Sequence, residues 1–290
     1  MFRHLSGLSV LAALALLQAT PPARAETYQT CAGVIESLPA TISSQGVWCL
    51  RKDLSTALAS GNAIEITTNN VTIDCNGFKI GGLAAGTGTM AVGIHAEERL
   101  NIGIRNCSVR GFHDGIALEG ATTTGGHLIE DNRLDQNTAT AIRVQGDGSV
   151  VRRNLVRDTG GSTVTAAVRG VSVEGEVDVL DNTISGLAAA VGSGGMAIGL
   201  RSDWNQGGSI VGNRIRGLAS DGTSAWGMGF YMNSRLVVAD NHVRVLNDGD
   251  VAVLCLNGTA NAILKDNVLV STSNAGVGTC IDGGGNFTIP

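Results

Sequence analysis

The sequence predicts an all-β chain that winds into a right-handed parallel β-helix of about eight coils, preceded by an N-terminal cap. Three observations predict this fold: an asparagine that recurs every 22 to 31 positions, a short apolar alternation ahead of it, and a composition of 41 glycines, four prolines and 3% aromatics. Apolar residues still make up 43% of the chain, so we expect a thin, repetitive core rather than disorder.

The first repeat is centred on a slot that holds asparagine in seven of eight coils. The slot residues are Asn76, Cys107, Asn132, Asn154, Asn182, Asn213, Asn241 and Asn267. The residues three positions before and two positions after each slot are apolar, as are Ile129 and Leu134 around Asn132. Stacked amides can bond to one another and satisfy a bent backbone, so we expect an asparagine column at one corner of the coil.

The second repeat lies 11 to 16 residues upstream of each slot. It begins at Ile64, Ile94, Ile116, Ile142, Val171, Ile198, Met228 and Val253, and another apolar residue follows two positions later. Such alternation is typical of a strand with one buried face. Each coil should therefore carry three short strands, which stack on their counterparts one coil away at about 4.8 Å. A leucine-rich-repeat horseshoe is disfavoured because helical spacing is missing between the strands.

The two ends of the chain have their own patterns. A charged start, an apolar run from Leu8 to Leu17 and the small-residue pattern Ala23-Arg24-Ala25 predict a secretory signal peptide over residues 1–25. Residues 26–60 are expected to form the cap, and residues 61–290 the β-helix. We therefore expect a secreted or periplasmic monomer that has no membrane segment after signal cleavage. A net charge of −5 with three lysines argues against nucleic acid as a partner.

Six cysteines in an exported chain are expected to pair. Sequential pairing would join Cys31 to Cys49, Cys75 to Cys107, and Cys255 to Cys280. The predicted register places Cys75 and Cys107 in adjacent columns that face different ways, so other connectivities stay open.

One face is the expected binding face. The connections from the third strand to the next coil are long at 79–92, 157–169, 185–196 and 216–226, and in repeat folds such insertions often line a binding surface. The alternative is that these loops are tolerated surface excursions. Beside them, the outward residues of the first strands should form two columns, the first with His95, Arg143 and Ser172, the second with Glu97, Glu119, Gln145, Glu174, Arg201 and Tyr231.

These columns supply the candidate site residues. Glu97 and Glu119 fall in successive coils, where one of two close carboxylates should be held protonated, whereas Glu119 and Glu174 are two coils apart. Arg143 and Arg201 suit a lyase, because arginine can neutralise a uronate carboxylate. The candidate catalytic residues are Glu97, Glu119, Arg143, Glu174 and Arg201. The candidate substrate-binding residues are His95, Gln145, Trp204, Trp226 and Tyr231. A solvated strand face is the alternative reading for each of them.

The repeat itself resembles a known family. The segments VTIDCNG, from Val71 to Gly77, and GIAL, from Gly115 to Leu118, look like those of right-handed parallel β-helix proteins of the pectate-lyase-like superfamily, over about residues 60–285. That superfamily includes lyases, hydrolases, epimerases and non-catalytic adhesins, so the resemblance implies the fold and leaves activity open. The aspartate clusters of its hydrolases, the calcium-binding aspartates of its pectate lyases and its epimerase signature are not found.

We therefore expect an exported β-helix that binds an extracellular polysaccharide, with lyase or hydrolase chemistry left open. The alternative is a non-catalytic surface or periplasmic module, an adhesin or structural protein that binds a glycan or another partner. No cofactor is predicted and no metal-ligand spacing is found. Calcium between Glu97 and Glu119 is a possibility without a motif to support it.

Overall fold

The computed structural model describes residues 31–121, 123–232, 234–247, 249–256, 262–271 and 274–289. The expected signal peptide, residues 1–25, lies outside this range, as does the start of the expected cap. Among the described residues the only helix is a 3₁₀ turn, η1 (Leu83–Ala85), and none of their helices is long and apolar enough to span a membrane.

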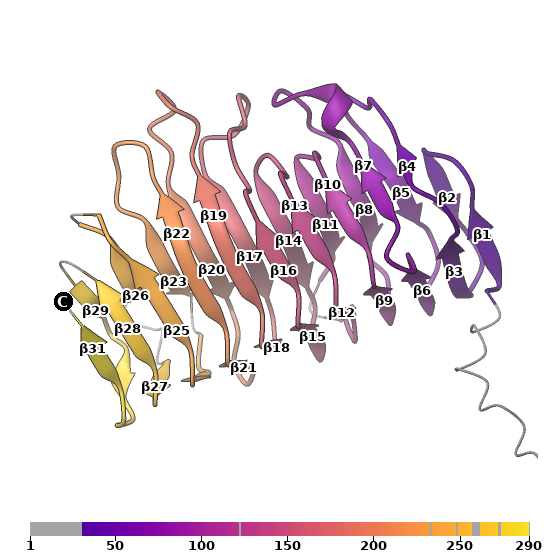
Figure 1. Cartoon of the computed structure of the whole chain (residues 1–290). Coiled ribbons are helices and arrows are strands. Elements are labelled where there is room, and N and C mark those ends of the chain that lie inside the picture. Colours follow the sequence, from indigo (N-terminus) through magenta and orange to yellow (C-terminus); the bar gives the residue numbers. More distant parts are fainter. Residues whose placement is uncertain are drawn as a thin grey trace, which may run out of the picture. The chain divides into compact units, whose positions relative to one another are not determined.

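The strands form three parallel sheets that run the length of the described chain (Figure 1). The first sheet takes the first strand of each coil: β2 (Ala40–Ile42), β5 (Asn62–Ile66), β8 (Val92–Glu97), β11 (Asp114–Glu119), β14 (Thr140–Gln145), β17 (Val168–Glu174), β20 (Ala197–Asp203), β23 (Trp226–Tyr231), β26 (Val251–Cys255) and β29 (Asn274–Gly278). Each strand pairs in parallel with the corresponding strand of the next coil, so each coil rests on the one before it.

The second sheet takes the strand that ends before the corner asparagine. It contains β1 (Gly33–Ile35), β3 (Gly46–Leu50), β6 (Val71–Asp74), β9 (Ile102–Arg105), β12 (Leu128–Glu130), β15 (Ser149–Arg152), β18 (Val177–Leu180), β21 (Ser209–Val211), β24 (Val237–Ala239), β27 (Ile263–Lys265) and β30 (Ile281–Asp282).

The third sheet takes the strand that follows the asparagine. It contains β4 (Leu54–Ser55), β7 (Lys79–Gly81), β10 (Ser108–Arg110), β13 (Arg133–Asp135), β16 (Leu155–Arg157), β19 (Thr183–Ala188), β22 (Arg214–Ala219), β25 (His242–Val245), β28 (Val268–Ser271) and β31 (Phe287–Ile289).

This arrangement confirms the predicted parallel β-solenoid. The eight predicted coils correspond to β5 through β28, and the described chain adds four strands before them, β1 to β4, and three after them, β29 to β31. The segment expected to act as a cap contributes β1 to β4, and these strands extend the same three sheets, with Ala40 opposite Ile64 and Leu54 opposite Ile80.

Identical aliphatic residues stack in the core as predicted. Ile64, Ile94, Ile116 and Ile142 pair in register across four successive coils, and all four are fully buried. Burying such a side chain contributes about 1.5–3 kcal/mol relative to leaving it exposed. Because the same residue type occupies the same core position in each of these coils, the coils have a common cross-section.

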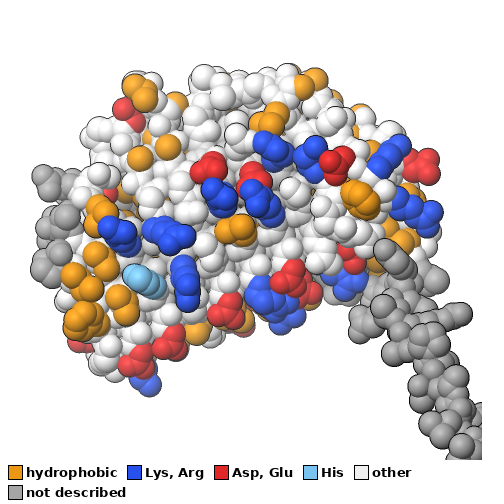
Figure 2. All heavy atoms as spheres, in the orientation of Figure 1, with side chains coloured by type: hydrophobic (Ala, Val, Ile, Leu, Met, Phe, Trp, Pro, Cys, Tyr) orange, Lys and Arg blue, Asp and Glu red, His pale blue; other side chains and the backbone are white. Residues whose placement is uncertain are grey.

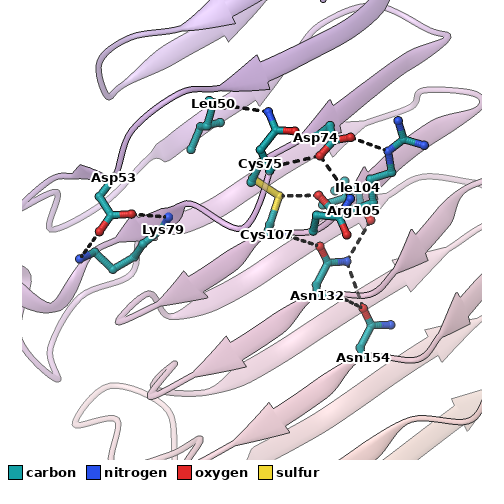
Figure 3. Close-up of a disulfide and its surroundings, with 12 residues drawn as sticks. Leu50, Asp53, Asp74, Cys75, Lys79, Ile104, Arg105, Cys107, Asn132 and Asn154 are labelled. Atoms are coloured by element: carbon teal, nitrogen blue, oxygen red, sulfur yellow. Dashed lines mark hydrogen bonds and ion pairs between the residues drawn. A yellow bond between two sulfur atoms is a disulfide. The ribbon is translucent and has the colours of Figure 1, made fainter. Parts of the chain in front are cut away.

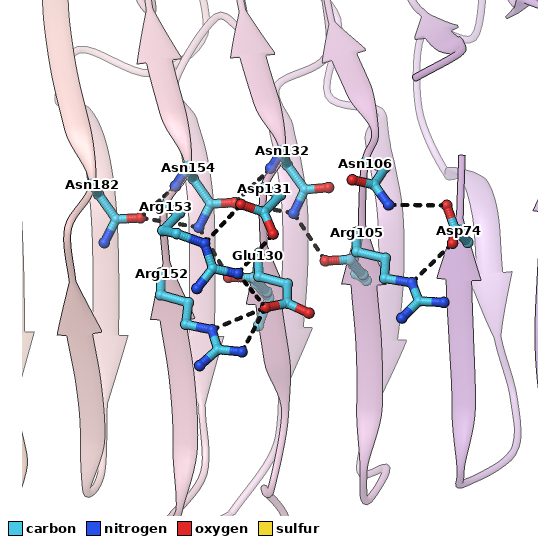
Figure 4. Close-up of polar contacts among 12 residues, drawn as sticks. Asp74, Arg105, Asn106, Glu130, Asp131, Asn132, Arg152, Arg153, Asn154 and Asn182 are labelled. Atoms are coloured by element: carbon cyan, nitrogen blue, oxygen red, sulfur yellow. Dashed lines mark hydrogen bonds and ion pairs between the residues drawn. The ribbon is translucent and has the colours of Figure 1, made fainter. Parts of the chain in front are cut away.

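A buried asparagine ladder forms the corner between the second and third sheets (Figure 4). In Asn154, the side-chain amide donates to the carbonyl oxygen of Ile129 at 2.9 Å and to Oδ1 of Asn182 at 3.0 Å. The ladder runs through Asn132, Asn154, Asn182, Asn213, Asn241, Asn267 and Asn286. Predicted slot residue Asn76 does not join it, because two left-handed residues, Asn76 and Gly77, occupy that corner and Asn76 donates to Leu50 instead.

All three expected disulfides are present. They join Cys31 to Cys49, Cys75 to Cys107, and Cys255 to Cys280. The bond between Cys75 and Cys107 lies at the end of the asparagine ladder (Figure 3). Its two sulfurs are buried although the register predicted that they face different ways. The corner after β6 has two more residues than the corner after β9, and this difference moves Cys75 relative to the slot.

Candidate functional site

The outward face of the first sheet carries polar side chains from coil to coil. Its middle column runs through Glu65, His95, Ala117, Arg143, Ser172, Arg201 and Gly229. A neighbouring column contains Glu97 opposite Glu119, and Gln145, Glu174, Asp203 and Tyr231 in succession. The predicted candidates therefore share one face, with the exception of Trp204, which follows the end of β20.

The expected column of Arg201 is wrong by two residues. Arg201 lies opposite Ser172, and the position next to Glu174 belongs to Asp203. Because alternation has a period of two, sliding β20 by two residues keeps every side chain on its own side of the sheet. Ser202, which is fully buried, takes the core position expected for Leu200. The pattern of apolar residues could not indicate that shift.

A chain of charged contacts occupies the early coils of this face. His95 contacts Glu65 at 2.9 Å and Glu119 at 3.6 Å. Hydrogen bonding to Glu119 is the main reason that the pKa of His95 is raised, and it also lowers the pKa of Glu119. Glu119 further contacts Arg143 at 3.4 Å. Glu119 is therefore held as a carboxylate, which suits a positioning or base role better than that of a proton donor.

Arg143 connects this chain to the next part of the face. Its guanidinium bonds Asp114 at 3.0 Å, and burial of Asp114 is outweighed by His113 and Arg143, which lower the pKa of its carboxyl. His113 in turn contacts Thr165 at 2.8 Å, in the long loop after β16. That loop is linked to the preceding one through Thr163 and Thr87. The long loops therefore join one another along the edge of the sheet.

A cavity of about 190 Å³ opens in the middle of the face. Its polar lining comes from three successive coils, β14, β17 and β20, and consists of Arg143, Gln145, Arg169, Glu174, Arg201 and Asp203. The distribution of charge is uneven. Arg201 bonds Asp203 at 2.8 Å, whereas Arg169 forms no ion pair with a described residue.

Arg169 and Asp203 have unusual electrostatic environments. Burial, together with repulsion from Arg201 and Arg143, lowers the pKa of the Arg169 guanidinium. Burial raises the pKa of the Asp203 carboxyl, and the charge of Glu174 raises it further. Arg169 Nε and Asp203 Oδ1 are both buried and have no hydrogen-bond partner among the described residues. Buried polar atoms are rarely left so, which makes the cavity the candidate binding site.

Glu174 and Asp203 form a pair of carboxyl groups on adjacent strands. They lie opposite each other across β17 and β20, and strands in a sheet are about 4.8 Å apart. Gln145 donates a hydrogen bond to Glu174 at 2.8 Å, and burial raises the pKa of the neighbouring Asp203 carboxyl. The cavity therefore holds two neighbouring carboxyl groups, and burial raises the pKa of one of them, Asp203.

An aromatic pair lies at the far side of the cavity. Trp226 and Tyr231 have ring centroids 5.9 Å apart, and the Arg201 guanidinium lies 4.5 Å from the Tyr231 centroid. Burial raises the pKa of Tyr231. Trp204 is 44% exposed and makes none of these contacts. Trp226 and Tyr231 could hold the face of a sugar ring beside the charged pocket.

Two central residues were missed by sequence reasoning. Arg169 lies in an outward position at the start of β17, beyond the alternating stretch used to define the columns, and Asp203 was hidden by the register shift. Arg169 is three positions before Ser172, so period-two alternation would point Gly170 outward instead. The structure breaks the alternation there, and a Cβ added to Gly170 would lie 2.6 Å from the buried Ile184 side chain. No signal in the sequence identifies Arg169 or Asp203.

No group of three or more His, Cys, Asp or Glu side chains that could hold a metal is found within the described part of the chain. Glu97 lies opposite Glu119, but Glu119 is already engaged by His95 and Arg143. That arrangement offers calcium no cluster of free carboxylates.

Residues 93–289 match the family described as a right handed beta helix region. No curated protein matches the chain. Among solved structures, the catalytic unit of a thermostable GH87 alpha-1,3-glucanase from Streptomyces thermodiastaticus is 14% identical, with a TM-score of 0.37 over 88% of this chain and 63% of that one. The chain thus spans less than two thirds of that glucanase chain.

Two further structures share the fold. The catalytic domain of a GH87 alpha-1,3-glucanase solved with tetrasaccharides is 14% identical, with a TM-score of 0.40 over 88% of this chain and 64% of that one. The A-module of a mannuronan C-5 epimerase from Azotobacter vinelandii is 12% identical, with a TM-score of 0.43 over 90% and 91% of the two chains. Each likeness concerns the fold alone.

Proposed function

The chain belongs to the right handed beta helix family, and on that premise we propose that the cavity between β14, β17 and β20 binds an acidic polysaccharide. The predicted right-handed coil is confirmed by this family match. The proposal itself rests on the contents of the cavity, since the fold accommodates many functions.

The unpaired Arg169 is the observation that carries the proposal. It is repelled by Arg201 and Arg143 and forms no ion pair with a described residue, so an anionic ligand would supply the partner that it lacks. A planar carboxylate can accept two parallel hydrogen bonds from a guanidinium, which suits a uronate. The buried Nε of Arg169 has no other partner among the described residues.

Two features favour a polymer over a small anion. The cavity lies on a sheet face whose polar column continues from Glu65 to Arg201, so a long chain can extend beyond it. Trp226 and Tyr231 provide aromatic surface at one end of the cavity. Three disulfides also support the expected export to an oxidising compartment, where such polymers occur.

Calorimetric titration of the full chain with a polyuronate and with a neutral glucan tests this proposal. We expect binding of the polyuronate only, weakened about 10- to 100-fold in Arg169→Gln, because a hydrogen bond to a charged group contributes about 1.5–3 kcal/mol. Arg157→Gln, on the third sheet, should bind normally. Equal affinity of Arg169→Gln and wild type for the polyuronate would contradict the proposal.

Cleavage of the bound polymer is a second candidate function, favoured by the raised pKa of Asp203 beside Glu174. In this role Asp203 protonates the glycosidic oxygen as its bond to the sugar breaks, and the Glu174 carboxylate attacks the anomeric carbon. Water then releases the sugar and returns a proton to Asp203. Carboxyl groups about 5 Å apart are typical of such a retaining mechanism.

The reducing ends released from a polyuronate measure this activity. Both Asp203→Asn and Glu174→Gln should abolish release while leaving polyuronate binding within a few fold. Unsaturated products, detected by ultraviolet absorbance, would instead indicate elimination and contradict the hydrolytic roles. Binding without turnover would identify a non-catalytic glycan-binding protein.

A further inference from the structure

A second group of cations lies on the outward face of the third sheet, away from the first-sheet cavity. Strands β22 and β25 pair directly, which places Arg214 opposite His242 and Arg216 opposite Arg244. All four side chains are exposed. Figure 2 shows basic side chains and a histidine gathered over this end of the sheet.

The other half of the same face is built differently. There three of the four cations have an acid beside them: Lys79 contacts Asp53 at 3.1 Å, Arg133 contacts Asp135 at 2.6 Å, and Arg157 contacts Asp158 at 3.8 Å. The fourth, Arg110, bonds Gln136. No ion pair with a described residue is formed by Arg214, Arg216 or Arg244. Like charges directly opposite each other destabilise a sheet. A chain of net charge −5 has acids to spare, so an uncompensated basic cluster indicates an anionic partner.

A cleft of about 420 Å³ lies between the two arginines that face each other. Arg216 and Arg244 border it together with Ser185, Leu218, Leu246 and Asn247. Leu218 is buried and Leu246 is 49% exposed, so the cleft has an apolar side as well as a charged one. The volume is within the range of small-ligand pockets, about 300–1,000 Å³.

Two aligned glycines, Gly186 and Gly217, leave part of the cleft wall without side chains. Gly217 has a φ of +66°, in the left-handed region that favours glycine, and interrupts the pairing of β22 with β19. A Cβ added there would lie 3.3 Å from the backbone nitrogen of Gly186, itself at φ +70°. The strands therefore carry no side chains at this level between Arg216 and Leu218.

We propose that this cleft is a second binding site, which takes one acidic sugar of a polysaccharide. The guanidinium groups of Arg216 and Arg244 hold the oxyanion, a carboxylate or a sulfate ester. Leu218 and Leu246 contact the C–H face of the ring, and Ser185 and Asn247 lie within the cleft to meet its hydroxyls. The site shares no residue with the first-sheet cavity and does not depend on it.

Binding of the full chain to four probes tests the inference: a polyuronate, dextran sulfate, unmodified dextran and sodium sulfate. The measurements use an Arg169→Gln background, in which the first-sheet contribution is weakened about 10- to 100-fold. We expect residual binding to an acidic polymer that weakens with salt. Adding Arg216→Gln and Arg244→Gln should lower that affinity at least 10-fold, whereas adding Arg157→Gln should leave it unchanged.

The two proposals fail in different ways. If Arg169→Gln binds as wild type but the Arg216 and Arg244 double variant does not, the first-sheet proposal is wrong and this one stands. Equal binding by the double variant and the Arg157 control overturns the second site. So does equal binding of unmodified dextran, or binding of sodium sulfate with none of the acidic polymers. Preference for polyuronate or for dextran sulfate identifies the oxyanion.

Discussion

Asn132 accepts a hydrogen bond through its side-chain oxygen from the backbone amide of Cys107, at 3.0 Å. Cys107 occupies the ladder position of its coil but has no amide with which to continue the stack. Its sulfur instead bonds Cys75 in the preceding coil. The disulfide therefore takes over the coil-to-coil connection at the point where the asparagine ladder stops.

Replacing one rung should cost much of the stability that the ladder provides. In Asn154→Ala, the Ile129 carbonyl and the backbone amide of Asn132 lose buried partners. We expect the free energy of unfolding to fall by about 2–4 kcal/mol, since each buried unsatisfied group costs about 1–3 kcal/mol. Denaturant titration measures this, with Thr183→Ala, on the partly exposed side of β19, expected to change it by less than about 0.5 kcal/mol.

Removing the disulfide at the ladder's end should be comparably costly. Cys75 and Cys107 are separated by 32 positions, and a cross-link over such a loop stabilises by about 2–4 kcal/mol. The Cys75→Ala, Cys107→Ala double variant should unfold at correspondingly lower denaturant. A thiol reductant should lower the stability of wild type further than that of the double variant, because wild type has one more bond to lose. If the double variant unfolded at the same denaturant concentration as wild type, the disulfide would not have this stabilising role.

The sequence was informative wherever chemistry and spacing repeat together. The ladder favours asparagine because one short amide side chain donates two hydrogen bonds and accepts two along the stack, so its slot is visible from the sequence. Register within the first sheet is less constrained. Leu200 and Ser202 both point inward in β20, and only packing against the neighbouring strands decides whether Leu200 faces Val171 or Val173.

That choice of register determines the candidate site. It brings Asp203 beside Glu174 and moves Arg201 next to Ser172. The first-sheet cavity thus depends on a two-residue shift that leaves the apolar alternation intact. The perturbed carboxyl of Asp203 could not be predicted, because its burial follows from how three coils meet rather than from any one strand.

His95 should make stability depend on pH. Its pKa is raised in the folded state, chiefly by hydrogen bonding to Glu119. The extra stability is therefore fully present below the unfolded pKa of about 6.5 and is lost as the pH rises through the folded pKa. His95→Gln should be less stable than wild type at pH 5.5 by up to about 1 kcal/mol, with the gap closing above the raised pKa. If the free energies of unfolding of the two proteins differed by the same amount from about pH 5 to 9, this role of His95 would be ruled out.

Asp203→Asn should stabilise the protein at neutral pH. Burial raises the pKa of Asp203 in the folded state, so the unfolded chain loses its proton first and stability falls as the pH rises above about 3.9. Asparagine does not titrate, so this variant avoids the loss of stability, and its side-chain oxygen can still accept the hydrogen bond from Arg201. We expect a gain of about 0.5–2 kcal/mol at pH 7, typical of substitutions that relieve a functional site. The gain should vanish near pH 3, and its persistence there would indicate another cause.

Two matched substitutions in the third sheet should change the free energy of unfolding in opposite directions. Arg244 faces Arg216, so Arg244→Glu replaces a like-charge pair with an opposite-charge pair and should raise the free energy of unfolding by about 0.2–1 kcal/mol. Arg157 faces Asp135, so Arg157→Glu creates an acid–acid pair and should lower it by a similar amount. Both differences should shrink in about 1 M salt, which screens exposed charges beyond about 3 Å.

Arg244→Glu should also weaken binding of an acidic polysaccharide at the third-sheet cleft, so that stability and binding change in opposite directions. If Arg244→Glu destabilises the chain at low salt, then other groups of the fold already neutralise the charge of the cluster. That result would contradict the proposal that the cluster is a binding site.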